Sequence, residues 1–107
     1  MHGNTRLNRG RMNRDLEETR RLVVEGLRGT GALIYLFGSW AKGYATRSSD
    51  IDVAVVCEKP VPPWLLGEIR ERLEESSVLY PVYLVDLSNA AGPFRDKVQA
   101  EGILWNG

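Results

Sequence analysis

Residues 36–56 read LFGSWAKGYATRSSDIDVAVV, which places a Gly-Ser turn and two aspartates between two apolar runs. The turn is Gly38-Ser39, and ten residues separate it from Asp50-Ile51-Asp52. Side chains two positions apart in a strand point to the same side, so Asp50 and Asp52 are expected to present their charges together. The apolar residues that alternate with them then face a hydrophobic layer. Two adjacent ionised carboxylates repel unless a cation lies between them or one is protonated, so the pair predicts a site for a hard cation such as Mg²⁺.

The composition is that of one globular domain. The 107 residues are 43% hydrophobic and 26% charged, and no apolar run approaches the roughly 20 residues that span a bilayer. The N-terminus lacks the apolar segment of a signal peptide, so we expect a cytoplasmic protein without membrane contact. Cys57 is the single cysteine, which excludes an internal disulfide and a cysteine-based zinc site.

Charge is uneven along the chain although the formal net charge is zero. Four arginines precede the first acidic residue, Asp15, and they are Arg6, Arg9, Arg11 and Arg14. We expect residues 1–14 to form a mobile, solvated basic arm, and residues 15–107 to form the domain. Contact of the arm with RNA, DNA or an acidic partner is the less favoured reading.

The periodicity of apolar residues predicts alternating helices and strands. Asp15 with Glu18 resembles a capping box and predicts a helix start, and Leu16, Val23 and Leu27 mark its apolar face. Further helices are expected at 39–42, from Trp64 onward and at 94–100, and strands at 32–37, 51–56, 82–87 and 103–105. This order predicts an α/β (α+β) fold, a small mixed sheet with helices packed on one face.

The pattern Gly38-Ser39-x10-Asp50-x-Asp52 resembles the minimal nucleotidyltransferases of the DNA polymerase beta superfamily. Ala41, Gly43, Ser49 and the flanking apolar strands also stand where that family has them, and the resemblance covers about residues 15–105. It implies a polymerase-beta-like nucleotidyltransferase fold. Such proteins commonly occur beside a helical HEPN toxin, as the antitoxin of a toxin–antitoxin pair, and members transfer AMP from ATP onto a tyrosine of the toxin.

The resemblance also implies roles for individual residues. Asp50 and Asp52 would hold one or two Mg²⁺ ions that bridge the phosphates of ATP. The residues expected to bind the nucleotide are Gly38, Ser39, Lys42 and Ser49, of which Ser49 is expected mainly to order the loop before Asp50. Trp40 and Tyr44 are candidates for stacking on a base, with core packing as the equal alternative for Trp40.

The third carboxylate of the superfamily is the point at which this chain departs from the pattern. The segment Val82–Leu87 reads VYLVDL, so Tyr83 occupies the first usual acidic position and Asp86 the second. These two side chains lie on opposite sides of an ideal strand. Either Asp86 serves as a metal ligand and catalytic residue through a bulge, or the site works with two carboxylates, or catalysis is weakened.

Two functional hypotheses follow. The first is a Mg²⁺-dependent nucleotidyltransferase of the protein adenylyltransferase type, which transfers a nucleoside monophosphate to an acceptor hydroxyl of a partner HEPN toxin. The alternative is a non-catalytic antitoxin or interaction subunit that neutralises its partner by binding alone, which Tyr83 and the apolar interface candidates Trp64, Leu65 and Trp105 favour. Transfer to a small molecule fits such a short chain less well. Homo-oligomerisation is left open.

Overall fold

One mixed four-stranded sheet organises the computed structural model, which describes the backbone of residues 2–106 and the side chains of residues 10 and 12–106. The strand order is β3-β2-β1-β4. β1 pairs antiparallel with β2 and with β4, and β2 pairs parallel with β3. The strands are β1 (Leu33–Phe37), β2 (Ile51–Val56), β3 (Val82–Asp86) and β4 (Ile103–Leu104). The predicted fold class is therefore confirmed, and the strand boundaries agree with the prediction to within one residue.

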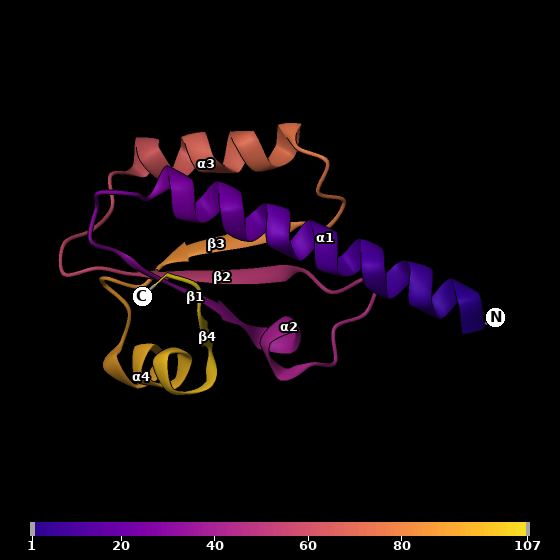
Figure 1. Ribbon diagram of the computed structural model, residues 1–107. Coiled ribbons are helices and arrows are strands. Elements are labelled where there is room, and N and C mark those ends of the chain that lie inside the picture. The colour runs from indigo at the N-terminus through magenta and orange to yellow at the C-terminus, as the bar shows by residue number, and fades with distance from the viewer. Residues whose placement is uncertain (1, 107) are drawn as a thin grey trace.

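Helices α1 (His2–Gly26) and α3 (Pro63–Glu75) cover one face of the sheet (Figure 1). Alternate residues of the central strands enter the core beneath them, because side chains in a strand alternate between the two faces. The fully buried members of this layer are Val23, Ile34, Ile51, Val53 and Val55.

The opposite face is covered as well, which corrects the expectation that the helices pack on one face. Helix α4 (Gly92–Glu101) lies there, and its Val98 packs with Tyr35, Ala54 and Leu87 in a second apolar cluster (Figure 1). The physical reason is that β1 and β2 are apolar on both sides, so leaving this face in water would expose Tyr35 and Ala54. The short helix α2 (Gly38–Lys42) follows β1 at the end of the sheet.

Helix α1 does not begin at Asp15, so the predicted helix start there is wrong. Asp15 lies within the helix and is 6% exposed. Its Oδ2 accepts a hydrogen bond of 3.2 Å from the Leu79 amide, and its carbonyl accepts one of 2.8 Å from the Thr19 hydroxyl. The carboxylate thus fixes the loop before β3 instead of capping a helix. The predicted apolar positions Val23 and Leu27 are buried, as expected.

The basic N-terminal segment belongs to α1 in its backbone, which is helical from His2 onward. The side chains of His2, Arg6, Arg9 and Arg11 lie outside the described residues, so the division of the chain at residue 14 stays a prediction. Among the described helices, none is both long and apolar enough to cross a membrane, although α1 has 25 residues.

Both edges of the sheet carry a feature that limits further strand pairing. At β3, the Arg70 guanidinium donates a 2.7 Å hydrogen bond to the Leu84 carbonyl. At the other edge, β4 contains only two residues. Asn106 follows it, and its side-chain amide bonds the backbone of Ala32 and Ile34. This amide ties the C-terminal segment to β1 beyond the short strand.

Candidate functional site

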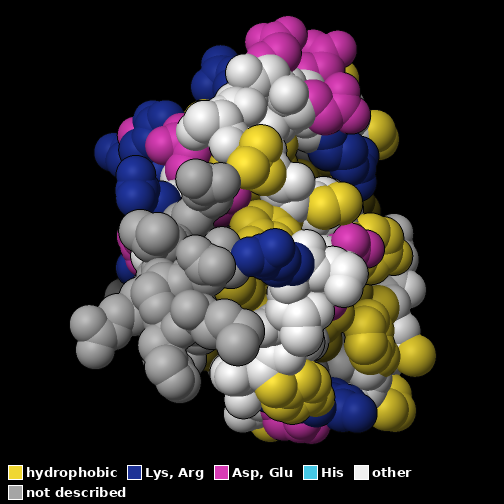
Figure 2. Space-filling model, turned by 90° about the vertical axis from the view of Figure 1, so that its right-hand side faces the viewer, with side chains coloured by type: hydrophobic (Ala, Val, Ile, Leu, Met, Phe, Trp, Pro, Cys, Tyr) yellow, Lys and Arg dark blue, Asp and Glu magenta, His cyan; other side chains and the backbone are white. Residues whose placement is uncertain are grey.

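Asp52 lies beside the Gly-Ser turn at the end of the β1–β2 pair, and Asp50 is close enough for its charge to act on Asp52. Phe37, the last residue of β1, lies opposite Asp52 in the antiparallel register, so Gly38 lies beside the Asp52 side chain. Ile51, Val53 and Val55 are each 0% exposed on the other face, which confirms the predicted alternation. This end of the sheet faces the viewer in Figure 2, where hydrophobic patches alternate with separate basic and acidic groups.

Gly38 is required at its position for two independent reasons. Its φ of 72° lies in the left-handed region, which residues with a Cβ adopt only with strain. A Cβ at this position would also overlap the Oδ2 atom of Asp52 and lie 3.3 Å from its Cγ. The glycine therefore allows the backbone to pass directly beside the carboxylate, as the close approach of a phosphate chain would also require.

The electrostatics of the pair favour a bound cation. Burial, and to a lesser degree the charge of Asp50, raise the pKa of Asp52 above its ordinary value. A cation would offset both effects, since it replaces lost solvation and screens the repulsion between the carboxylates. Carboxylate oxygens are the ligands that Mg²⁺ prefers, and it retains waters or takes phosphate oxygens where protein ligands are few. The donor set thus fits Mg²⁺ held by two protein carboxylates.

Asp86 is not brought to this pair. The β2–β3 register is continuous and places Asp86 beside Val55, three residues, or roughly 10 Å, along the strand from the position of Asp52. The Asp86 oxygens accept hydrogen bonds from the Val61 amide at 3.0 Å and from the Ser88 amide and hydroxyl at 2.9 and 2.7 Å. Asp86 thus anchors the loops around α3 and β3.

The third-ligand role predicted for Asp86 is therefore not supported by this geometry, because the bulge that it required is absent from the continuous β2–β3 register. Among the described residues, no group of three or more His, Cys, Asp or Glu side chains is placed to hold a metal ion. Tyr83 is the residue in register with Asp52, and it is 57% exposed.

Lys42 and Ser39 lie on α2, next to Gly38. The Lys42 ammonium is 3.6 Å from Glu101 Oε1 of α4, and both side chains are nearly half exposed. Such an exposed pair exchanges readily with solvent or with a phosphate. The Ser39 carbonyl accepts the backbone N–H groups of Gly43 and Tyr44, which closes the helix. Nucleotide binding by Ser39 and Lys42 is compatible with this arrangement and stays a prediction.

Ser49 organises the loop before Asp50, as its sequence position suggested. Its Oγ accepts a 2.9 Å hydrogen bond from the Thr46 amide, and its carbonyl accepts one of 3.4 Å from the Trp40 indole. The Trp40 ring packs edge-to-face on Tyr80, with 5.1 Å between ring centroids, and is 9% exposed. Trp40 is thus a core residue in this structure. Nucleotide binding by Ser49 also stays a prediction.

The two other tryptophans differ in their surroundings. Trp105 is buried, and its carbonyl accepts a 3.1 Å hydrogen bond from Arg20 of α1. Trp64 is 68% exposed at the start of α3, so it is not part of the hydrophobic core. Core packing is therefore confirmed for Trp105, while an interface role for Trp64 stays a prediction.

A small cavity of about 190 Å³ adjoins Gly38, between α2 and α4. Its lining includes Lys97 and Glu101, which sequence reasoning did not identify. No local signal marks them, because α4 reaches the site only through the fold. The lining residues are Phe37, Gly38, Ala41, Lys42, Phe94, Lys97, Val98, Glu101 and Gly102.

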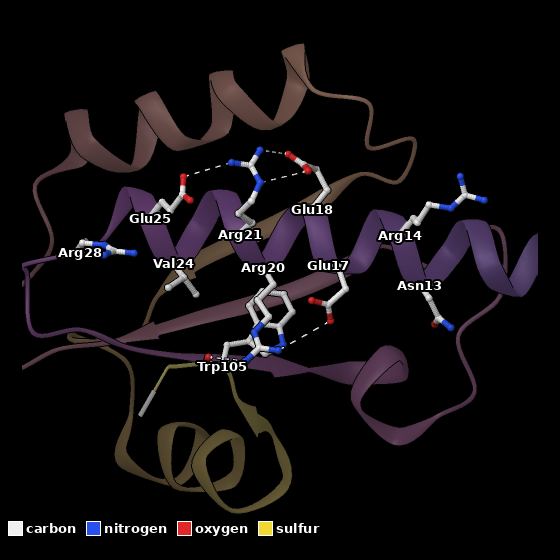
Figure 3. Close-up of a pocket in the computed structure, with 10 residues that line it drawn as sticks. All are labelled: Asn13, Arg14, Glu17, Glu18, Arg20, Arg21, Val24, Glu25, Arg28 and Trp105. Carbon is white, nitrogen blue, oxygen red and sulfur yellow. Dashed lines mark hydrogen bonds and ion pairs between the residues drawn. The ribbon is translucent and has the colours of Figure 1, made fainter.

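A wider surface hollow of about 670 Å³ lies along α1 and Trp105 (Figure 3), and neither Asp50 nor Asp52 belongs to its lining. Its charges are largely paired with one another. Arg21 forms ion pairs with Glu18 and with Glu25, and Arg20 lies 3.9 Å from Glu17. This hollow lacks the glycine turn and the paired aspartates, so the candidate site remains at the end of β1 and β2.

Two curated proteins are similar to this chain in sequence. The protein adenylyltransferase MntA of Shewanella oneidensis is 38% identical over 74 residues, which are 68% of this chain and 52% of that protein. The MntA protein of Haemophilus influenzae is 30% identical over 66 residues, 62% of this chain and 58% of that protein. The chain thus spans little more than half the length of the curated relatives it matches.

Solved structures are similar to this chain in fold and in sequence. A crystal structure of a toxin–antitoxin with AMP-PNP has a TM-score of 0.65 at 31% identity, over 82% of this chain and 73% of that one. A structure of tri-AMPylated Shewanella oneidensis HEPN toxin in complex with MNT antitoxin has a TM-score of 0.58 at 26% identity. The match covers 85% of this chain and 71% of the matched chain. The family model of polymerase beta nucleotidyltransferases matches residues 31–105, most of the chain and the whole of the site, and the protein therefore belongs to that family.

Proposed function

We propose that this protein is a Mg²⁺-dependent nucleotidyltransferase that transfers AMP from ATP to a tyrosine hydroxyl of a partner HEPN toxin, and so acts as an antitoxin. The observation that carries the proposal is the position of Asp52, which lies beside a glycine that tolerates no side chain and close enough to Asp50 to feel its charge. The MntA relatives and the toxin complexes support the choice of reaction and partner. With ATP as substrate, we expect the reaction to take place in the cytoplasm.

Each site residue has a defined task in this proposal. Asp50 and Asp52 would hold Mg²⁺, which supplies charge neutralisation for the triphosphate when bound. Gly38 lets the backbone approach the phosphates, because it has no Cβ. Lys42 exchanges its ion pair with Glu101 for a phosphate oxygen of the departing pyrophosphate. The acceptor hydroxyl approaches from the exposed side of the sheet end.

The second candidate is neutralisation of the partner by binding alone. Two observations favour it: Tyr83 stands beside Asp52 where a third carboxylate is usual, and Trp64 exposes 68% of its surface at the start of α3. Exposed tryptophans are common anchors of protein interfaces. On this reading, the chain keeps a nucleotide site that is not needed to neutralise the toxin.

Incubation with α-labelled ATP, Mg²⁺ and the partner toxin separates the two candidates. Transfer predicts a labelled toxin with the wild-type protein and no label with Asp50→Asn. Asp96→Asn, which neutralises an exposed carboxylate of α4, is the matched control and should label normally. Absence of label with the wild type, or persistent label with Asp50→Asn, would refute the proposed reaction. Full protection of cells by the doubly substituted Asp50→Asn/Asp52→Asn protein would favour binding alone.

A further inference from the structure

Tyr83 is an exposed side chain on the strand next to Asp52, one of the two aspartates proposed to bind Mg²⁺. Its backbone is in register with Asp52, and neighbouring strands are ~4.8 Å apart. Both residues also point to the same face of the sheet. Val85 and Leu87, at two-residue steps from Tyr83, pack into the cluster that contains Ala54, two residues after Asp52. The phenol thus stands beside Asp52 with more than half of its surface open to solvent.

We infer that the Tyr83 hydroxyl is an acceptor of AMP from the protein's own site, so that the chain adenylylates itself in cis. The inference rests on the proposed function, because it needs the same bound ATP. A phenol is the same acceptor group that we propose for the partner. Tyr83 holds it on the strand next to the carboxylates, so no second protein is needed to deliver it.

The other three tyrosines are less well placed. Tyr35 is 8% exposed beneath α4, and Tyr80 packs against Trp40 in the core on the α3 side. Tyr44 is 64% exposed, but it lies in the loop after α2 and not on a strand beside Asp52. Tyr44 therefore provides a comparison of the same chemistry and similar exposure at a different position.

The reaction balances as an ordinary adenylyl transfer. The Tyr83 phenolic oxygen attacks the α-phosphorus of ATP and forms a new P–O bond. The bond between the α-phosphorus and the oxygen that bridges to the β-phosphorus breaks, and pyrophosphate leaves with the electron pair. The phenolic proton passes to water, which reaches the exposed side chain. The adenylylated Tyr83 then holds AMP over Asp52 and limits access of a second ATP.

Mass spectrometry of the purified chain tests this directly. After incubation with ATP and Mg²⁺, we expect the intact mass to rise by one adenylate group. Trypsin leaves residues 73–95 as one peptide that contains both Tyr80 and Tyr83, and fragmentation assigns the group to one of them. Tyr83→Phe should lower the label at least tenfold, and Tyr80→Phe, which keeps the ring packed on Trp40, should keep it. The labelled fraction should grow at a rate that does not depend on protein concentration.

A second readout does not depend on turnover. In protein carrying 3-fluorotyrosine, titration with Mg²⁺ alone should shift the ¹⁹F resonance of Tyr83, which Tyr83→Phe identifies, more than that of Tyr44. A Tyr83 resonance that Mg²⁺ leaves unmoved would contradict its placement beside the metal site.

The outcomes also separate this inference from the proposed function. A chain that labels the toxin and leaves itself unmodified, or that is modified at Tyr44 or Tyr80, overturns the inference and leaves the proposed function standing. Failure to label either protein overturns both.

Discussion

Replacement of Gly38 by alanine tests the central geometric claim, that the Asp52 carboxylate depends on a missing side chain. At φ 72°, an alanine is strained by about 1–2 kcal/mol. Its Cβ also overlaps Asp52 Oδ2, and moving that carboxylate off its rotamer costs about 1 kcal/mol more. We therefore expect Gly38→Ala to lower the free energy of unfolding by about 2–3 kcal/mol.

Gly43→Ala is the matched control, because it isolates the backbone strain. Gly43 has a φ of 86° at the end of α2, and a Cβ built there meets no atom within 4 Å. Gly43→Ala should lower the free energy of unfolding only by the backbone strain, which is about 1–2 kcal/mol. Urea denaturation measures both losses. Titration with Mg²⁺ and a non-hydrolysable ATP analogue should show at least tenfold weaker binding for Gly38→Ala, and unchanged binding for Gly43→Ala.

A double-mutant cycle with Asp52→Ala completes this test. Removing the carboxylate relieves the overlap, so the loss of unfolding free energy caused by Gly38→Ala should be about 1 kcal/mol smaller in the Asp52→Ala background. The loss caused by Gly43→Ala should be the same in both backgrounds. Equal stability losses for the two glycine variants, no coupling to Asp52 and wild-type binding by Gly38→Ala would together refute the claim.

Three further predictions concern charges around the site. Burial and the charge of Asp50 raise the pKa of Asp52, so the metal-free native state loses stability as pH rises through that pKa. Asp52→Asn should therefore have a higher free energy of unfolding than the wild type at pH 7, a gain that urea denaturation should find lost at acid pH. Asp86→Ala should cost about 2 kcal/mol, because the amides it satisfies lose their acceptor, and calorimetry should show unchanged Mg²⁺ binding. Glu101→Gln frees Lys42 and should tighten binding of the ATP analogue by up to about fivefold, whereas Lys42→Ala should weaken it.

The central part of the site could be predicted from the sequence because it is local. Gly38, Asp50 and Asp52 lie within one β-α-β segment, where the two-residue alternation of a strand fixes which side chains share a face. The burial of the alternate residues of β2 followed from the same rule.

The parts that sequence reasoning missed depend on contacts between distant segments. The capping-box pattern at Asp15 is a local signal, but the Leu79 amide, far along the chain, binds that carboxylate. The ion pair between Lys42 and Glu101 likewise forms only when α4 docks on the second face of the sheet. The role of Asp86 depended on the β2–β3 register, which no local pattern specifies.

The hydrogen bond from Arg70 to the Leu84 carbonyl has a consequence for how the molecule meets other proteins. The guanidinium occupies an acceptor that an incoming strand would need at β3, and β4 at the other edge is too short to template a partner strand. Growth of the sheet by edge-to-edge addition is therefore disfavoured, which protects the isolated chain from aggregation. Contact with another protein is then expected through side chains outside the strand edges, such as the exposed Trp64 of α3 and Phe94 of α4.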